Sequence, residues 1–479
     1  MTLTHIAVAA AAALLYSWLL PGRWRGWALM LASVVAIYWL GTPLAIRYLD
    51  FVLPTATLVL TVLVWLFVRD PKAGMGREDW IALGASAALV LGLSATRYLV
   101  PELRPTPSRA PDVLPVALGL LLAAGAALGL WRVLGGRRGL LSGTIGFIVL
   151  LFILLKTKPL TIGVSRLLRE LAGQQADLAR ASDVAWLGFS YVAFRLIHML
   201  RDRQTAKLPA LSLREALTYV LFFPAYTAGP IDRAERFVAD YRALPEMVGP
   251  DTARLTVGAS RILVGILKKF VIADSLVLLS LNATNATQAV TTAGLWVLLY
   301  GYAFRLYLDF SGYTDIAVGL GILYGLRLPE NFNWPYLKQN IAAFWQSWHI
   351  TLSNWVRFYV FSPLSRALML RKPAPSPLLI VFVSQMATML VIGLWHGVSW
   401  NFIAWGAWHG VGLFLHKWWS DRTRRWYLGL KDRPRLRQAW IVTGMLLTFQ
   451  FVTLGWVWFA LPDIGLAWDV FLRLLGIGG

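Results

Sequence analysis

The sequence predicts an all-α, polytopic transmembrane protein, and three observations carry this prediction. Of its 479 residues, 58% are hydrophobic and only 14% are charged, whereas soluble globular proteins carry about 25% charged residues. Several apolar runs approach the length of about 20 residues that a helix needs to cross a bilayer. The runs are continuous rather than alternating, so helices are favoured over the strands of a barrel.

Six apolar runs are the clearest candidate spans, at 51–68, 80–94, 113–130, 139–155, 378–395 and 441–459. A further run at 6–20 resembles a signal peptide in length. It lacks a basic N-terminal region, and another apolar run at 27–40 follows at once. We therefore expect the first run to be retained as a span.

Basic loops set the expected orientation. The formal net charge is +21, but most Lys and Arg lie in short segments between apolar runs, where they indicate the cytoplasmic side rather than a nucleic-acid partner. The loops expected inside are 22–26, 69–79, 135–139, 201–207, 371–373 and 421–438. Threading spans between them gives about eleven crossings, with the N-terminus outside and the C-terminus inside. The loop 97–112 then falls outside.

The chain is expected to form a single integral membrane domain, 1–479, with two unlike parts. Residues 1–183 read mainly as packing helices rich in Ala, Gly and Ser. From 184 to 479 the apolar segments also contain charged residues, Pro, Gly and His. Ionisable residues inside a membrane are costly and mark functional interiors. The Pro and Gly residues at 224–230 favour a broken or re-entrant helix beside a cavity.

Two histidines are the candidates for chemistry. Trp345, His349, Ser353 and Arg357 are each four residues apart, which would place them on one helix face. Such a face suits either an interfacial amphipathic helix or a reactive wall. His396 follows a run that contains no charged residue from 378 onward. It reads either as a packing histidine with satisfied nitrogens or as a general base.

Other polar residues are expected to support these two. His198 and His409 lie on apolar segments as weaker candidates. Arg305 and Asp309 are four residues apart and could pair, with Asp315 nearby, as a buried network that fixes helix geometry. Lys268, Lys269 and Asp274 are expected at the end of a span, where the lysines would extend toward the membrane surface.

Several common chemistries have no motif here. The chain contains no Cys, no HExxH metal motif, no phosphate-binding loop and no GxSxG nucleophile turn. We expect no metal ligands and no bound cofactor.

Six stretches together resemble the membrane-bound O-acyltransferase (MBOAT) family. They are "FFPAYTAGPI", "KKFVIAD", "DFSGYTDIAVGLGILYGLRLPENFNWPY", "FWQSWHITLSNWVRFYVFSPL", "GLWHGVSWNFIAWGAWHG" and "FVTLGWVWF". The resemblance runs from about residue 189 to the end and is strongest to the bacterial branch that includes alginate O-acetylation and teichoic-acid D-alanylation membrane proteins. Two family patterns differ here: Phe358 stands where an acidic residue is usual, and Ala460 where Arg is usual.

The resemblance implies a function and roles for residues. It implies a central tunnel in a bacterial-type cytoplasmic (inner) membrane protein, with His396 as the catalytic base and His349 opposite it. The donor would be an acyl thioester, either acyl-CoA or an acyl carrier protein, and the acceptor a hydroxyl of an envelope or exported glycan. Membrane lipid and an extracytoplasmic protein are the further partners to expect, and nucleic acid is not. The residues expected to bind substrate or support the histidines are Trp345, Trp348, Ser353, Trp395, Asn401, His409, Asp309, Arg305 and Asp315.

Two other functions remain open on the sequence. Intramembrane charges and broken helices also describe transporters and flippases of polar or lipid-linked substrates, although no inverted repeat is visible. A non-catalytic scaffold with the same fold is the other alternative.

Overall fold

The computed structural model describes residues 1–479 except 71–73, 101, 103–104, 135–137, 248, 250 and 478–479. Its described residues form helices joined by turns, with one isolated antiparallel bridge between Phe332 and Trp348 and no strand. The all-α fold class predicted from continuous apolar runs is therefore confirmed. Parts of the basic loops predicted at 69–79 and 135–139 lie outside the described residues.

The chain divides into two compact units. The first comprises Met1–Ile262 and Ile316–Leu328. Its helices are α1 (Leu3–Leu19), α2 (Gly22–Trp39), α3 (Leu49–Val68), α4 (Arg77–Leu99), α5 (Val113–Leu134), α6 (Arg138–Lys156), α7 (Lys158–Leu171), η1 (Ala176–Leu178), η2 (Ala181–Val184), α8 (Phe189–Gln204), α9 (Leu213–Leu221), α10 (Phe223–Tyr226), α11 (Ala234–Ala243), η3 (Leu244–Glu246) and most of α12 (Thr252–Ile266).

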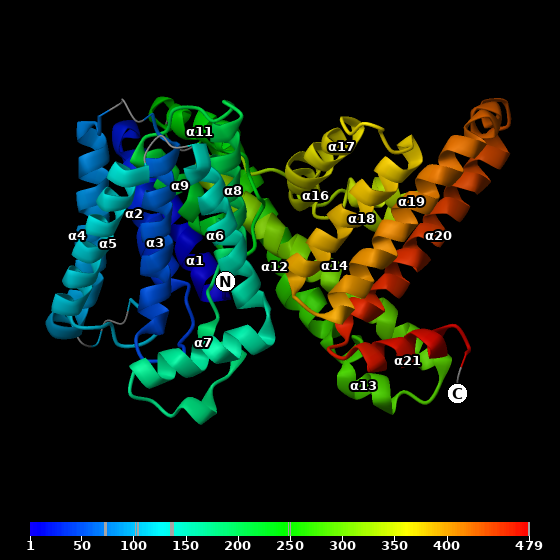
Figure 1. The fold of residues 1–479 in the computed structure, drawn as a ribbon, viewed down its shortest axis with the longest axis horizontal. Helices are drawn as coiled ribbons and strands as arrows, with labels where there is room; N and C mark the ends of the chain where they lie inside the picture. The colour runs from blue at the N-terminus through cyan, green and yellow to red at the C-terminus, as the bar shows by residue number, and fades with distance from the viewer. Residues whose placement is uncertain are drawn as a thin grey trace. The chain divides into compact units, whose positions relative to one another are not determined.

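The second unit comprises Leu263–Asp315 and Pro329–Gly479. Its elements are η4 (Leu267–Ala273), η5 (Leu276–Leu279), α13 (Ala283–Gln288), most of α14 (Thr292–Leu323), η6 (Pro335–Leu337), α15 (Ile341–Trp345), α16 (Ile350–Val356), η7 (Arg357–Phe361), α17 (Ser362–Met369), α18 (Pro377–His396), α19 (Trp400–Gly429), η8 (Leu430–Asp432), α20 (Pro434–Ala460) and α21 (Ile464–Leu474). Within this unit α18, α19 and α20 pack side by side (Figure 1).

Six of the described helices are long and apolar enough to cross a membrane: α3, α4, α5, Gly139–Lys156 of α6, α18 and α20. They coincide with the six apolar runs predicted from the sequence. Each can cross because an α-helix satisfies its own backbone hydrogen bonds where no water is present. The total of about eleven crossings and the orientation of the termini stay predictions.

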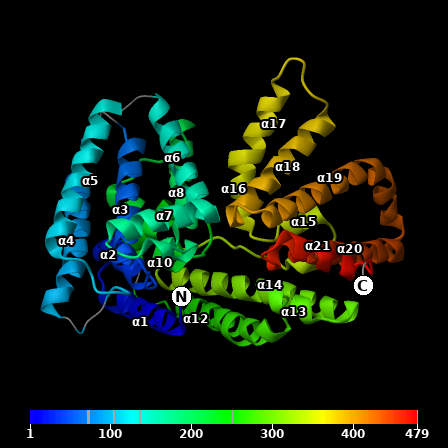
Figure 2. The ribbon, with the colours of Figure 1, turned by 60° about the horizontal axis from the view of Figure 1, so that its bottom comes forward.

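The packing of α18 against α19 depends on two glycines. A Cβ atom built on Gly393 would lie 2.2 Å from the carbonyl oxygen of Phe402, and one on Gly406 would lie 2.7 Å from that of Met389. Small residues let membrane helices approach this closely. The close neighbour of Gly393 is therefore α19. The turn at 397–399 reverses the chain between α18 and α19, and Figure 2 shows the pair from a second direction.

The helix break predicted at 224–230 is present, because α9 ends at Leu221 and only the four-residue α10 follows. The buried Arg195 side chain satisfies carbonyl groups around the break, donating to Val220 O at 2.7 Å and Ala225 O at 2.8 Å.

The basic segment 421–438, expected as a loop, is largely helical. It forms the end of α19, the short η8 and the start of α20, so the actual connection is a tight turn.

Candidate active site

His349 lies in a sharp turn rather than in a helix. Its backbone has φ 42° and ψ 54°, the left-handed conformation that residues other than Gly rarely adopt. The turn separates α15 from α16. The expectation that Trp345, His349, Ser353 and Arg357 share one helix face is therefore wrong, because the helix that spacing assumes is interrupted at His349.

A distant asparagine holds this turn. The fully buried Asn331 accepts Ile350 N–H on its backbone oxygen at 2.9 Å. Its side-chain Oδ1 accepts the Thr351 hydroxyl at 2.6 Å and Thr351 N–H at 3.3 Å. A residue in a strained conformation persists only when its surroundings hold it there, and such residues cluster at functional sites. Asn331 lies in the "ENFNWPY" stretch but was not among the predicted site residues. The feature of the sequence that could have pointed to it is an amide side chain within a largely apolar motif.

The His349 ring is buried against aromatic rings. Phe310 contacts it edge-on with ring centroids 4.8 Å apart, and Trp395 does so at 5.9 Å. Neither ring nitrogen of His349 has a hydrogen-bond partner among the described residues. Buried polar atoms are nearly always satisfied, so such an exception calls for a functional explanation.

His396 ends α18 within a second set of rings. Its ring lies 4.5 Å from Trp395 and 4.7 Å from Phe459, measured between centroids. Trp405 of α19 is 5.5 Å away. Trp395 thus contacts both candidate histidines, which the fold brings to the same aromatic cluster. Whether they line one cavity stays a prediction.

His409 belongs to the same cluster. It is fully buried, lies 4.9 Å from Trp405 and 5.2 Å from Trp345, and has no described partner for either nitrogen. A Cβ on Gly455 of α20 would be 3.1 Å from its Nε2. Sequence spacing ranked His409 below His349, yet both are equally enclosed.

Two other predicted residues have structural contacts. Asn401 donates from Nδ2 to Leu461 O at 2.8 Å, which fastens the start of α19 to the end of α20. Trp348 stacks on Phe344, with ring centroids 5.6 Å apart, and lies 5.1 Å from Trp456. Asn401 and Trp348 therefore support the aromatic cluster without a ring contact to His349 or His396.

A cavity of about 360 Å³ borders α15, α16 and α18. Trp345, Ser353 and Arg357 line it together although they do not share a helix face. Ser353 also donates to the Trp348 carbonyl at 3.2 Å. Thr388 and Gln385 of α18 also line the cavity. The buried Oε1 of Gln385 lacks a hydrogen-bond partner in the described structure.

The predicted Arg305–Asp309 pair is replaced by other pairs. Lys269 contacts Asp309 at 2.5 Å, and Lys268 contacts Asp315 at 2.6 Å. In the described part of the chain, Arg305 donates a hydrogen bond to the Ser280 hydroxyl, at 3.5 Å. The two lysines lie in η4, a π-helical segment, and both point to α14 instead of extending to the membrane surface as expected. The interpretation of a network that fixes helix geometry suits these partners.

Gly312 allows η4 and α14 to approach closely enough for these ion pairs. It lies on α14 between the two aspartates, and a Cβ there would be 2.8 Å from Gly265 O and 2.9 Å from the Lys268 Cβ.

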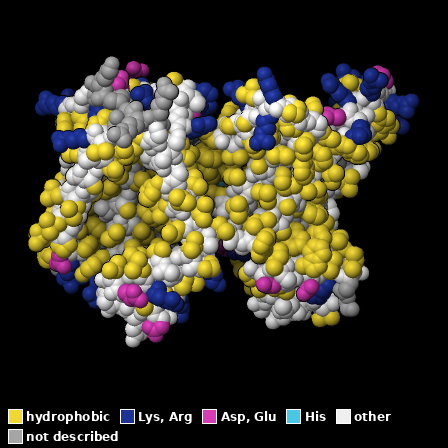
Figure 3. All heavy atoms as spheres, viewed as in Figure 1, with side chains coloured by type: hydrophobic (Ala, Val, Ile, Leu, Met, Phe, Trp, Pro, Cys, Tyr) yellow, Lys and Arg dark blue, Asp and Glu magenta, His cyan; other side chains and the backbone are white. Residues whose placement is uncertain are grey.

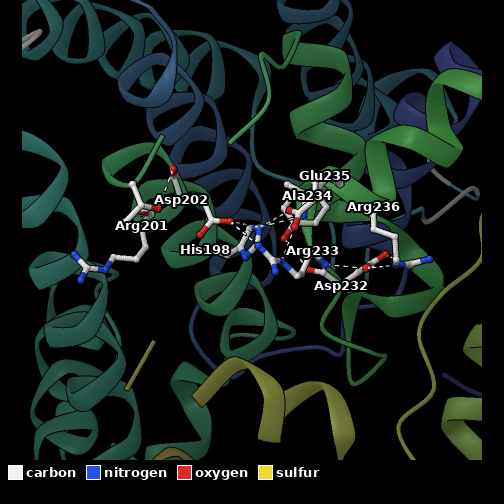
Figure 4. Close-up of polar contacts among 10 residues, drawn as sticks. His198, Arg201, Asp202, Asp232, Arg233, Ala234, Glu235 and Arg236 are labelled. Carbon is white, nitrogen blue, oxygen red and sulfur yellow. Dashed lines mark hydrogen bonds and ion pairs between the residues drawn. The ribbon is translucent and has the colours of Figure 1, made fainter. Parts of the chain in front are cut away.

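In the first unit, His198 belongs to a network of charges (Figure 4). Its Nε2 lies 3.5 Å from Asp202 and 3.7 Å from Glu235, and these three could hold a metal ion by distance alone. However, Nε2 already accepts Ala234 N–H at 3.1 Å, and Arg233 contacts both carboxylates, at 3.3 and 2.6 Å. The arrangement fits a neutralised ionic network better than a metal centre.

Asp232 extends that network. Burial raises the pKa of its carboxyl, although the Arg236 guanidinium bonded to it acts in the opposite direction. The network fastens the start of α11.

Known proteins resemble this chain over most of its length. The model of the MBOAT, membrane-bound O-acyltransferase, family matches residues 6–458. A teichoic acid D-alanyltransferase of Streptococcus thermophilus is 33% identical over 65% of this chain and 73% of its own length. A probable alginate O-acetylase of Pseudomonas aeruginosa is 33% identical over 61% of this chain. A peptidoglycan O-acetyltransferase of Helicobacter pylori is 32% identical over 58%.

The chain covers 52% of the length of each of the latter two relatives. The three names describe D-alanyl transfer for teichoic acid and acetyl transfer for alginate and peptidoglycan. The resemblance drawn from the six motifs is confirmed. The chain belongs to the membrane-bound O-acyltransferase family and is an acyltransferase.

Proposed function

We propose that this protein transfers an acyl group from a cytoplasmic thioester donor to a hydroxyl of an envelope or exported glycan. The observation that carries the proposal is the contact of Trp395 with both His349 and His396. The names of the three relatives support the acceptor class. The thioester donor rests on the sequence resemblance.

His396 serves as the general base. It takes the proton of the acceptor hydroxyl while that oxygen bonds to the acyl carbonyl carbon. The carbon–sulfur bond then breaks, and the departing thiolate receives the proton from the imidazolium. His349, whose nitrogens have no partner in the described structure, is available to donate a hydrogen bond to the oxyanion or to the acyl carbonyl.

The donor arm enters through the 360 Å³ cavity. That cavity lies on the same α16 that begins at His349. Its lining offers Gln346, Asn354 and Gln385 amides, which match the amide groups of the pantetheine arm shared by CoA and carrier proteins. A few polar groups in a mostly apolar lining fix the orientation of a ligand.

The acceptor enters from the opposite side of the membrane in this proposal. The cytoplasmic orientation expected for 371–373 and 421–438 makes α18 run outward, so His396 at its end lies in the outer part. The product then forms outside without a flipping step.

Acyl transfer by purified protein tests the proposal. Labelled acyl-CoA and acyl carrier protein are supplied separately with alginate, peptidoglycan and teichoic-acid acceptors. His396→Ala should lower turnover by about 10²–10⁴-fold. His5→Ala, a histidine of the first unit, is the control. Near-normal turnover in folded His396→Ala, or no transfer from either donor, contradicts the proposal.

Sided vesicles test the direction. Donor confined to the cytoplasmic face should acylate acceptor confined to the outer face. A requirement for both on one face overturns the transmembrane route.

A further inference from the structure

A second pocket lies where α19 and α20 meet, away from the aromatic cluster. Its volume is about 210 Å³. It is lined by Gln339, Asn340, His416, Trp419, Ser420, Thr423, Arg424, Trp426, Tyr427, Trp440 and Gly444. The Arg424 guanidinium, the Ser420 hydroxyl and two side-chain amides in one pocket are donors suited to an anion, and indole rings flank them.

The charge around this pocket is strongly positive. Arg424 has no carboxylate partner among the described residues, whereas the nearby Asp421 is held by Lys417 at 2.5 Å. The turn adds the cations Arg422, Arg425, Lys431, Arg433, Arg435 and Arg437. Figure 3 shows Lys and Arg gathered at this end of the second unit. An unpaired guanidinium among excess cations favours a phosphate, which Arg binds in a bidentate manner.

An apolar stripe leads from the pocket along α19. Val411, Leu415 and Trp419 are four residues apart and therefore share a face. Their side chains are 42, 53 and 49% exposed. Trp419 belongs to both the stripe and the pocket, so an amphiphile with a phosphate in the pocket would have its chain on this stripe.

The depth of the pocket matches the membrane surface. Trp440 and Gly444 lie in the first turns of α20, which is a candidate membrane span. Trp side chains concentrate at the level of lipid headgroups. The indole rings therefore suit a pocket whose polar part faces lipid headgroups and a stripe that faces acyl chains.

We propose that this pocket binds one anionic phospholipid, with its phosphate on Arg424 and Ser420 and an acyl chain along Val411, Leu415 and Trp419. The proposal is independent of the acyl-transfer function. Free CoA would share the phosphate chemistry but has no acyl chain to lie on the apolar stripe.

The purified full-length protein, with phosphatidylcholine as background lipid, tests this. Retention of added phosphatidylglycerol is measured by native mass spectrometry, with thermal unfolding in parallel. Phosphatidylcholine, inorganic phosphate and CoA are the comparison ligands. Phosphatidylglycerol alone should be retained and should raise the unfolding temperature.

Arg424→Ala should weaken that retention about tenfold or more, because a charge-assisted bond is lost. The neighbouring Arg425→Ala, outside the pocket, should weaken it less than about fivefold. Leu415→Gln should also weaken lipid retention without changing phosphate binding. If Arg424→Ala fails to fold, Ser420→Ala and Leu415→Gln give the answer.

Equal loss in Arg424→Ala and Arg425→Ala overturns the proposal, since it indicates general charge attraction. Equal retention of phosphatidylcholine also overturns it. Binding of CoA or phosphate that depends on Arg424 but not on Leu415 would instead assign the pocket to a soluble phosphorylated ligand, and the lipid proposal would fail.

Discussion

His349 and Trp395 meet edge-on, with ring centroids 5.9 Å apart and planes at 70°. Trp395 also lies against its neighbour His396. The indole thus contacts both histidines, and we expect its size to influence how they are spaced.

Trp395→Leu is expected to lower kcat by up to about 10²-fold, because small displacements of reacting groups cost that much. The KM for the donor should change little, since the 360 Å³ cavity is not lined by Trp395. Steady-state kinetics with varied donor measure both. The exposed Trp400→Leu is the control, and a Trp395→Leu enzyme with wild-type kcat would refute the spacing role.

Asn331→Ala is expected to destabilise the His349 turn. It leaves Thr351 N–H and its hydroxyl without their acceptor, at a cost of about 1–3 kcal/mol. The rate should fall through kcat at unchanged donor KM. Asn333→Ala, an exposed residue of the same stretch, should be near wild type. Equal effects of the two changes would mean that Asn331 does not position His349.

Gln385→Leu is expected to raise the donor KM by about two- to tenfold, the effect of losing one hydrogen bond. The kcat should be retained, because Gln385 lines the cavity and does not belong to the aromatic cluster around His396. Donor titration at saturating acceptor measures this. Gln438→Leu, in the first turn of α20, is the matched control. An unchanged KM would remove this cavity from the donor path.

Lys268→Met is expected to lower the free energy of unfolding by about 1–3 kcal/mol, because the ion pair between Lys268 and Asp315 is lost. Removing both charges in Lys268→Met/Asp315→Leu should recover part of the loss. Lys417→Met breaks the exposed pair with Asp421 and should cost less than about 1 kcal/mol. Denaturant unfolding in detergent compares them; similar costs at both sites would contradict the role of the η4–α14 pairs.

Orientation can be tested because the chain has no cysteine. Arg435→Cys, at the start of α20, should resist an impermeant maleimide added to intact cells. Ser399→Cys, in the turn before α19, should react quickly. Both residues are exposed in the structure. The reverse labelling pattern would invert the topology and the direction of transfer.

The sequence by itself determined the helical class and the six long spans. These features are local, because an apolar run of sufficient length satisfies its backbone within one helix. The six motifs likewise identified the family, because the order of residues along the chain can be compared without knowing how the helices pack.

Only the tertiary structure revealed the left-handed backbone conformation of His349. The four-residue spacing from Trp345 to Arg357 describes a continuous helix, but Asn331 supplies hydrogen bonds from another segment and holds a left-handed turn instead. In the same way, spacing paired Arg305 with Asp309, whereas the π-helical η4 presents two successive lysines to α14. Periodicity reports which residues share a face; which distant groups meet that face depends on packing, because hydrogen bonds and ion pairs form with whatever the fold places within reach.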